Sequence, residues 1–259
     1  MLTTIIVQYN KLFVKKKQQE KIGLFQLVFL YFYMHIRYDK RKTEVFTMAD
    51  PKQKYYEKRA QVLLKNLKSR HFEAYYCATR EEALQQALSL IPEGSSVGWG
   101  GALSAQQIGL LDAVNAGNYQ AIDRDKTATP AERDAAQRKC LTADYFITGA
   151  NALSIDGQMV NIDGNGNRVA AIVYGPQNVI VIAGMNKVVD SLEAAVVRAR
   201  TVAAPMNKQR FALQTPCEVT GTCADCKSEG CICNQMLITR NSKPAGRIKM
   251  VIVGEELGF

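Results

Sequence analysis

Histidine is almost absent from this 259-residue chain, which contains only His35 and His71. This scarcity excludes a histidine-rich metal site and argues against a Ser-His-Asp triad, because only His71 lies in residues 48–259, which we expect to form the domain. Long apolar runs are missing too: residues 24–36 are fewer than the ~20 that a membrane-spanning helix needs, and no small-residue cleavage site follows them. The chain also lacks a Walker A ending and the dinucleotide spacing Gly-x-Gly-x-x-Gly. We therefore expect no membrane span and no standard nucleotide-binding loop.

Most of the excess positive charge lies at the start of the chain. The formal net charge is +9, and residues 1–47 hold nine Lys or Arg against three acids, which leaves +3 for the rest. No basic stripe with interleaved aromatic residues follows, so we expect no nucleic-acid partner. Residues 1–47 are either a membrane-surface anchor or upstream sequence translated from a wrongly chosen start. The abrupt change of composition at Met48 favours the second interpretation, with residues 48–259 as the domain.

From Met48 onward the patterns predict an α/β fold whose mainly parallel sheet is flanked by helices. Apolar residues at helical spacing alternate with short apolar strand patterns through most of the domain. We expect helices over 51–69, 79–91, 104–115, 130–142 and 191–204, with Thr79 and Ser104 as N-caps. We expect strands over 72–78, 96–100, 119–122, 145–148, 169–174, 179–183 and 248–253, with a hairpin around Gly157.

Three loops that follow expected strands contain residues suited to a small anion. The first, from Gly98 to Ser104, is rich in glycine and enters a helix, which favours a phosphate or carboxylate; a tight strand-to-helix turn would use the same residues. The second, 148–168, consists mainly of ordinary turn residues, but a turn does not need Arg168, which could clamp a carboxylate bidentately. The third ends in Lys187, interpreted as an anion-binding residue, a catalytic amine or a solvated lysine.

Ligand sites in α/β sheets lie beyond the carboxyl ends of the strands, so these loops together predict one site for a small anionic ligand. The expected ligand-binding residues are Gly100, Gly101, Ser104, Asn151, Asn167, Arg168, Asn186 and Lys187. No residue stands out as a certain catalytic group, and the candidates for a base are Lys187 and Asp156.

Five of the seven cysteines lie in the short segment 217–233. A tight cluster in an α/β chain favours metal over disulfides, and indicates a reducing compartment such as the cytoplasm. A Cys-x-x-Cys pair, here Cys223 and Cys226, presents two thiolates to one metal, and soft sulfur ligands select an iron–sulfur cluster or zinc. The alternatives are free thiols or a redox disulfide pair. Cys77 and Cys140 are expected to be structural.

Several long motifs, in one order, resemble the LUD-domain family of lactate utilisation proteins, formerly DUF162. The resemblance covers about Tyr55 to Phe259 and includes the cysteine segment. Its other motifs are DYFITGANA from Asp144, NIDGNGNRV from Asn161, VIAGMNK from Val181, RARTVAAP from Arg198 and VGEELGF from Val253. Residues 1–47 have no counterpart in it, which agrees with a mis-called start.

The resemblance implies a fold like that of glucosamine-phosphate deaminase, ribose-phosphate isomerase and coenzyme A transferase, the NagB/RpiA/CoA-transferase-like fold. It also implies a link to oxidation of L-lactate to pyruvate, as one subunit beside iron–sulfur partner subunits. In the subfamily with C-terminal cysteines, the pattern aligns Cys217, Cys223, Cys226 and Cys233 as metal ligands. Cys231 departs from that pattern, because it stands where an arginine is expected.

Three functions are compatible with these residues. The first is a subunit or electron carrier in L-lactate oxidation that binds a small anion in the glycine-rich loops. The second is a stand-alone enzyme of the isomerase or CoA-transferase kind, acting on a phosphorylated or acyl-CoA substrate with Lys187 or Asp156 as base. The third is an interaction protein whose metal site is purely structural.

Overall fold

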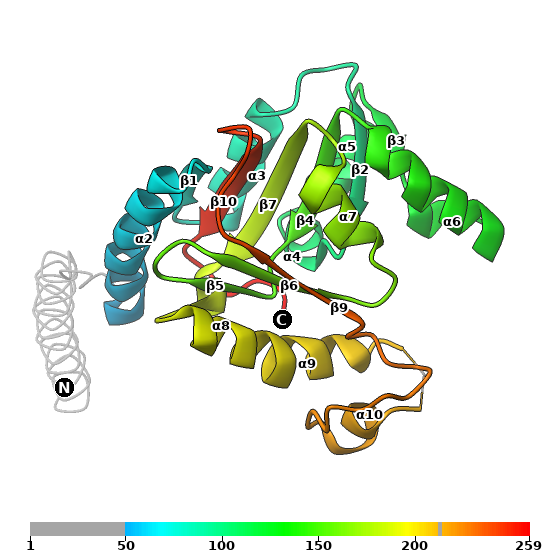
Figure 1. The fold of residues 1–259 in the computed structure, drawn as a ribbon. Helices are drawn as coiled ribbons and strands as arrows, with labels where there is room; N and C mark the ends of the chain where they lie inside the picture. The colour runs from blue at the N-terminus through cyan, green and yellow to red at the C-terminus, as the bar shows by residue number, and fades with distance from the viewer. Residues whose placement is uncertain (1–49, 212–213) are drawn as a thin grey trace, which may run out of the picture. The chain divides into compact units, whose positions relative to one another are not determined.

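The computed structural model describes residues 50–211 and 214–259 (Figure 1). The expectation that residues 1–47 are a mis-called extension lies outside the described residues. No helix in the described ranges is long and apolar enough to cross a membrane. The α-helices are α2 (Pro51–Ser69), α3 (Arg80–Ser89), α4 (Leu103–Gln107), α5 (Leu110–Ala116), α6 (Pro130–Lys139), α7 (Asn167–Tyr174), α8 (Leu192–Arg198), α9 (Ala204–Lys208) and α10 (Pro216–Thr220).

The larger sheet has six strands in the order β1-β10-β7-β4-β2-β3, and every neighbouring pair runs parallel. Its strands are β1 (Glu73–Cys77), β2 (Ser96–Gly100), β3 (Gln120–Ile122), β4 (Tyr145–Gly149), β7 (Asn178–Gly184) and β10 (Ile248–Val253). The predicted α/β architecture, a parallel sheet flanked by helices, is confirmed. Because all strands point the same way, the loops after β2, β3, β4 and β7 emerge at one edge of this sheet.

Helices cover both faces of the larger sheet, and alternating side chains of each central strand serve the two faces. In β4, Phe146 packs with residues of α2 and α7, whereas Ile147 packs with residues of α3, α4 and α5. In β7, Val179 and Val181 lie on the first face and Ile180 on the second. Burial on both faces explains why these strands are near-continuous apolar runs in the sequence.

A second, four-stranded sheet has the order β8-β5-β6-β9 and lies beside the helical segment that begins at α8 (Figure 1). Its strands are β5 (Ala152–Ser154), β6 (Met159–Asp163), β8 (Val188–Val189) and β9 (Gln235–Thr239). The predicted hairpin around Gly157 is the antiparallel pair β5–β6. Strand β9, which follows the cysteine segment, has no counterpart among the expected strands. Strand β9 pairs with β6, with Gln235 opposite Asp163. This pairing attaches the end of the cysteine segment to the second sheet.

The expectation of a buried strand over 169–174 is wrong, because this segment is helix α7. Two side chains outside this short helix stabilise its ends, one close in sequence and one distant. The Asp163 carboxylate accepts hydrogen bonds from the backbone amides of Arg168 (2.9 Å) and Val169 (3.2 Å) at its first turn. The Arg247 guanidinium donates to the carbonyls of Ala171, Ile172 and Pro176 at its end, over 3.0, 2.6 and 3.0 Å. An apolar run alone does not distinguish a short buried helix from a strand.

The expected helix from 104 to 115 is also wrong in detail, since it is broken into α4 and α5 at Gly109, whose φ is +79°. Ser104 does not cap α4: the N-cap position is Ala102, and the Ser104 hydroxyl accepts a hydrogen bond from Lys187. By contrast, Thr79 caps α3 as expected, by accepting from the backbone amide of Glu82 over 3.3 Å.

Arg247→Ala should lower the free energy of unfolding by about 2–4 kcal/mol, because three carbonyl acceptors lose a charged donor. Arg247→Lys should recover only part of this loss, since one ammonium cannot match the planar fork of a guanidinium. Urea unfolding of the native chain and of the two variants measures these changes in the free energy of unfolding. The control Arg138→Ala breaks an exposed ion pair with Asp134 and should cost at most about 0.5 kcal/mol. Equal losses for the two alanine variants would contradict a capping role of Arg247.

Candidate anion-binding site

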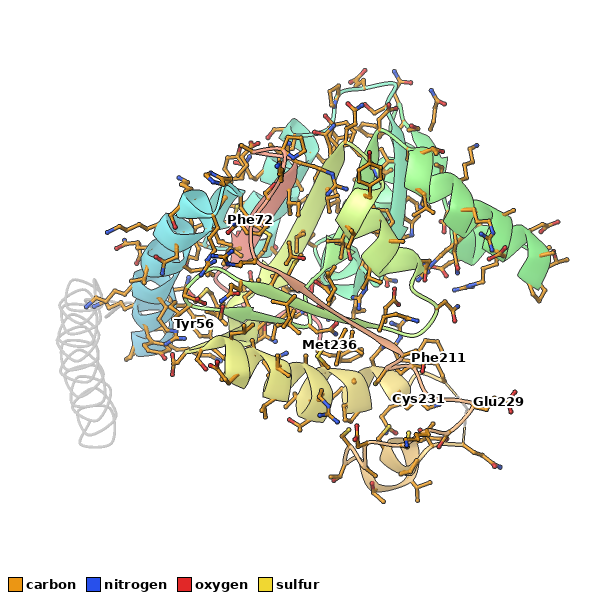
Figure 2. The ribbon with its side chains drawn as sticks, in the orientation of Figure 1. Tyr56, Phe72, Phe211, Glu229, Cys231 and Met236 are labelled. Atoms are coloured by element: carbon orange, nitrogen blue, oxygen red, sulfur yellow. The ribbon has the colours of Figure 1, made fainter. Side chains whose placement is uncertain are left out.

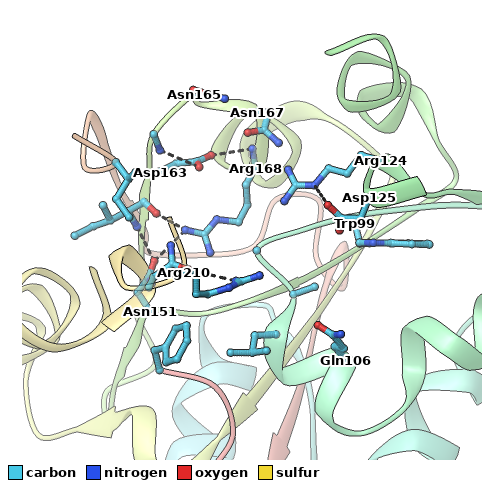
Figure 3. A pocket seen from close by; sticks show the side chains of 18 of the residues that line it. Trp99, Gln106, Arg124, Asp125, Asn151, Asp163, Asn165, Asn167, Arg168 and Arg210 are labelled. Carbon is cyan, nitrogen blue, oxygen red and sulfur yellow. Dashed lines mark hydrogen bonds and ion pairs between the residues drawn. The ribbon is translucent and has the colours of Figure 1, made fainter. Parts of the chain in front are cut away.

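A pocket of about 390 Å³ lies at the edge where the loops after β2, β3, β4 and β7 emerge (Figure 3). Five of its lining residues are cationic and two are acidic. The cationic residues are Arg124, Arg133, Arg168, Lys187 and Arg210, and the acidic ones are Asp125 and Asp163. Asp125 forms an ion pair with Arg133 over 2.8 Å, and the Asp163 carboxylate accepts hydrogen bonds from backbone amides of α7. The pocket therefore presents a net positive charge to a ligand.

Arg168 forms the wall of this pocket at the start of α7, and it is only 8% exposed. Its Nη2 donates to Asn151 Oδ1 over 3.0 Å and, more closely, to the Ile162 carbonyl (Figure 3). No described residue accepts a hydrogen bond from its Nε or Nη1, so one side of the guanidinium fork is left for a ligand. Burial lowers the pKa of Arg168, Asp163 opposes that shift and Arg124 adds to it.

The glycine-rich loop after β2 makes room for this arginine. Gly101 has a φ of +57°, and a Cβ built on it would lie 2.7 Å from Arg168 Nη1. Any other residue would be strained in backbone conformation and would push the guanidinium out of position. The loop therefore contributes to the site through close packing against Arg168.

Lys187 follows β7 and is 4% exposed, so it is not the solvated lysine that a surface loop would allow. Its Nζ donates to Ser104 Oγ over 3.0 Å. Burial first, and then the charges of Arg198 and Arg168, lower the pKa of Lys187 from 10.5 to about 7. The amine therefore loses its proton near neutral pH, about three units below an ordinary lysine.

Arg198 donates hydrogen bonds to the backbone of three segments around the pocket. Its guanidinium donates to the carbonyls of Asn186 (3.2 Å) and Phe259 (3.3 Å) and, more closely, to that of Asn151. It stands at the end of α8, where the backbone widens into a π-helical turn over Ala199–Ala203 before α9. Such turns are frequent at functional sites.

The structure brings five of the expected ligand-binding residues to the pocket: Gly101, Asn151, Asn167, Arg168 and Lys187. Ser104 lies directly behind Lys187, to which it is hydrogen-bonded. Asn186 instead accepts from the backbone amide of Leu257, and the Gly100 carbonyl accepts from Thr148. Asp156 lies at the β5–β6 turn, where it pairs with Arg70 over 3.0 Å, and it does not line the pocket.

Sequence reasoning did not identify several pocket residues, above all Arg124 after β3 and Trp99 in β2. Arg124 Nε is buried without a hydrogen-bond partner in the described residues, and its nearest carboxylate oxygen, on Asp125, is 4.0 Å away. The signal that could have revealed Arg124 is its place just after a strand, as with Arg168 and Lys187.

The cysteine segment adjoins the same pocket. Ile232, between Cys231 and Cys233, is one of the lining residues. Asn234 fixes the segment to the loop before α7, because its backbone amide donates to the Asp163 carbonyl (3.0 Å) and its side chain to the Gly164 carbonyl (3.1 Å). Figure 2 labels Cys231 in the segment that joins α10 to β9, and Phe211, a residue of the pocket lining that follows α9.

The cysteines have the donor chemistry of a thiolate metal site, but the structure does not bring them into a coordination sphere. Within residues 50–211 and 214–259, no group of three or more His, Cys, Asp or Glu is arranged to hold a metal ion. Desolvation of its sulfur, and then the neighbouring thiols of Cys231, Cys223 and Cys217, raise the pKa of Cys233 to about 12. A bound cation would reverse this effect, because a coordinating thiol is deprotonated. Cys77 and Cys140 are buried in the core.

Comparison with known proteins identifies the family. The family model described as the LUD domain matches residues 60–253, so the chain belongs to the LUD-domain family. A DUF162 family protein from Deinococcus radiodurans has a similar structure, with 12% identity, a TM-score of 0.46 and coverage of 76% of this chain and 97% of that one. No curated protein gave a significant sequence match.

Two further solved structures show weaker similarity. Ribose 5-phosphate isomerase A from Neisseria gonorrhoeae has 17% identity and a TM-score of 0.28, covering 44% of this chain and 56% of its own. The eIF2B delta subunit from Chaetomium thermophilum has 14% identity and a TM-score of 0.31, covering 54% of this chain and 57% of its own.

Lys187→Met should stabilise the protein below pH 7, where folding of the native chain has to bury a charged amine. Between about pH 7 and 10.5 the unfolded chain keeps this proton and the folded chain does not, so native stability rises with pH by up to about 1.4 kcal/mol per unit. The advantage of the variant should therefore shrink by about 2.7 kcal/mol between pH 6 and 9. Urea unfolding across this range measures the difference. The exposed Lys68→Met control should show a constant difference, and a constant difference for Lys187→Met would contradict the lowered pKa.

Proposed function

We propose that this protein is a component of a lactate-utilisation system that binds a small carboxylate, such as L-lactate or pyruvate, in the pocket at Arg168. The observation that carries this proposal is the buried, half-satisfied guanidinium of Arg168 in a pocket of net positive charge. A carboxylate would complete its hydrogen bonding bidentately, which is the geometry in which arginine binds such groups best. The family is linked in general terms to lactate utilisation, and this ligand class agrees with that link.

Two further features support a small carboxylate. The Arg124 guanidinium lines the same pocket as Arg168 and adds a second positive charge that attracts an anion. Asn151 and Asn167 add neutral polar groups to the lining, which can hold a hydroxyl or carbonyl oxygen beside the carboxylate.

Arg168→Met should raise the Kd for L-lactate and pyruvate by about 10–100-fold, because the ligand carboxylate loses one or two charge-assisted hydrogen bonds. Isothermal titration calorimetry on the full chain measures the affinity, and near-ultraviolet circular dichroism checks the fold. Arg138→Met, an exposed residue of α6, is the matched control and should leave Kd unchanged. An unchanged Kd in Arg168→Met would exclude the role given to this residue. Binding of a sugar phosphate or acyl-CoA without either acid would favour the isomerase-like or transferase-like alternative.

We also propose that the cysteine segment holds a metal through Cys217, Cys223, Cys226 and Cys233, with Cys231 outside the ligand set. The support is the thiol-only donor set and the attachment of the segment to the pocket through Ile232 and Asn234. An iron–sulfur cluster supplies one-electron transfer when bound, whereas zinc is redox-silent. With a cluster, the protein would act beside iron–sulfur partner subunits in L-lactate oxidation. All seven cysteines are free thiols in the structure, as a reducing compartment such as the cytoplasm requires.

Cys226→Ala should lose the metal, whereas Cys231→Ala should keep it. Metal and sulfide analysis, with an absorption spectrum of anaerobically purified full-length protein, tests this assignment. Iron with sulfide and a visible band that only Cys226→Ala abolishes would support an electron-transfer role. Zinc would support a structural site instead, and equal metal content in both variants and the native protein would exclude the proposed ligand set.

A further inference from the structure

Lys187 is the one lysine that lines the pocket in the described parts of the chain, and its amine is buried without an acidic partner there. Among the described residues, its Nζ donates one hydrogen bond, to Ser104 Oγ over 3.0 Å. The charged groups nearest to it are the guanidiniums of Arg198 and Arg168, and the backbone of Gly258 covers it closely. A lysine binds an anion most strongly when its amine is protonated, and the neighbouring guanidiniums disfavour the protonated form of Lys187.

The same surroundings favour a different use of the amine. A lysine that is desolvated and placed next to other cations is neutral near physiological pH, and the neutral amine is a nucleophile. Its lowered pKa, about 7, agrees with that state. Lys187 also lines the pocket, so a bound ligand can reach it.

The position of Arg168 restricts what the amine can attack. The two side chains interact electrostatically and line the same pocket. In a small ligand held by its carboxylate at Arg168, the carbon next to the carboxylate is the first that the Lys187 amine can attack. A carbonyl at that carbon defines a 2-oxo acid. This argument depends on the carboxylate site proposed above, and it adds a covalent step and a substrate class to it.

We propose that Lys187 is a nucleophilic amine that forms a reversible imine with the carbonyl carbon of a small 2-oxo carboxylate bound at Arg168. The neutral amine adds to the carbonyl carbon, a carbon–nitrogen bond forms, and the carbonyl oxygen takes a proton to give a carbinolamine. Loss of this oxygen as water and of the second amine proton leaves the carbon–nitrogen double bond. The step needs no oxidant or reductant. Ser104 is a positioning residue, because its hydroxyl holds the Lys187 amine.

The test uses the full chain, pyruvate as the probe and sodium cyanoborohydride, which reduces imines to stable secondary amines. Peptide mapping by mass spectrometry should find the adduct at Lys187, formed at least about 100-fold faster near pH 7 than at the exposed Lys68, because a neutral amine is the nucleophile and an ammonium is not. Lys187→Met should lose this adduct, and Lys68→Met should keep it. L-lactate, which has no carbonyl group, should give none.

Calorimetry with pyruvate separates failure of this inference from failure of the carboxylate site. Pyruvate binding that depends on Arg168, without an adduct at Lys187, would overturn the imine and leave the carboxylate site standing. No pyruvate binding and no adduct would overturn both. Labelling of Lys187 by butanone as fast as by pyruvate would show a reactive amine without carboxylate recognition, and would overturn the substrate class.

Discussion

The burial of positive charge at one edge of the parallel sheet is the constraint on which the site depends. Arg168 and Lys187 are almost inaccessible to solvent, and neither has a carboxylate partner among the described residues. A buried cation is costly unless it is hydrogen-bonded or neutralised. The Arg168 guanidinium donates hydrogen bonds to Asn151 and to the Ile162 carbonyl. For Lys187, burial and the neighbouring cations lower the pKa, so that the amine becomes neutral instead. One cation thus stays charged beside another that loses its proton near neutral pH.

The fold maintains this arrangement through groups that never touch a ligand. Asp163 fixes the first turn of α7, from which Arg168 projects. Arg247, the residue before β10, fixes the other end of the same helix. Gly101 provides the space into which the guanidinium fits. The segment after α10 returns through β9 onto β6, and Ile232, between Cys231 and Cys233, lines the pocket. Binding site and cysteine segment therefore share the loop that begins at Asp163.

Local patterns in the sequence were sufficient for the main sheet and most of its helices. Strands buried on both faces are continuous apolar runs, so β4, β7 and β10 were predictable, and Thr79 marks the start of α3. Helix α7 was not predictable in this way. Its apolar run fits a strand equally well, and the groups that decide for helix, Asp163 and Arg247, lie outside it in sequence. The same applies to Ser104, whose hydroxyl serves Lys187 instead of the helix start.

By itself the sequence determined the family, the parallel α/β architecture, and the loops in which a ligand would bind, because these depend on periodicity and on motifs of adjacent residues. Only the tertiary structure decided which residues of those loops meet. It placed Asp156 away from the pocket and added Arg124 to it. It also showed that Lys187, for which a solvated position was one of three interpretations, is a buried amine. The physical reason is that the burial and the electrostatic neighbours of a side chain come from segments distant in sequence, and these set its charge and reactivity.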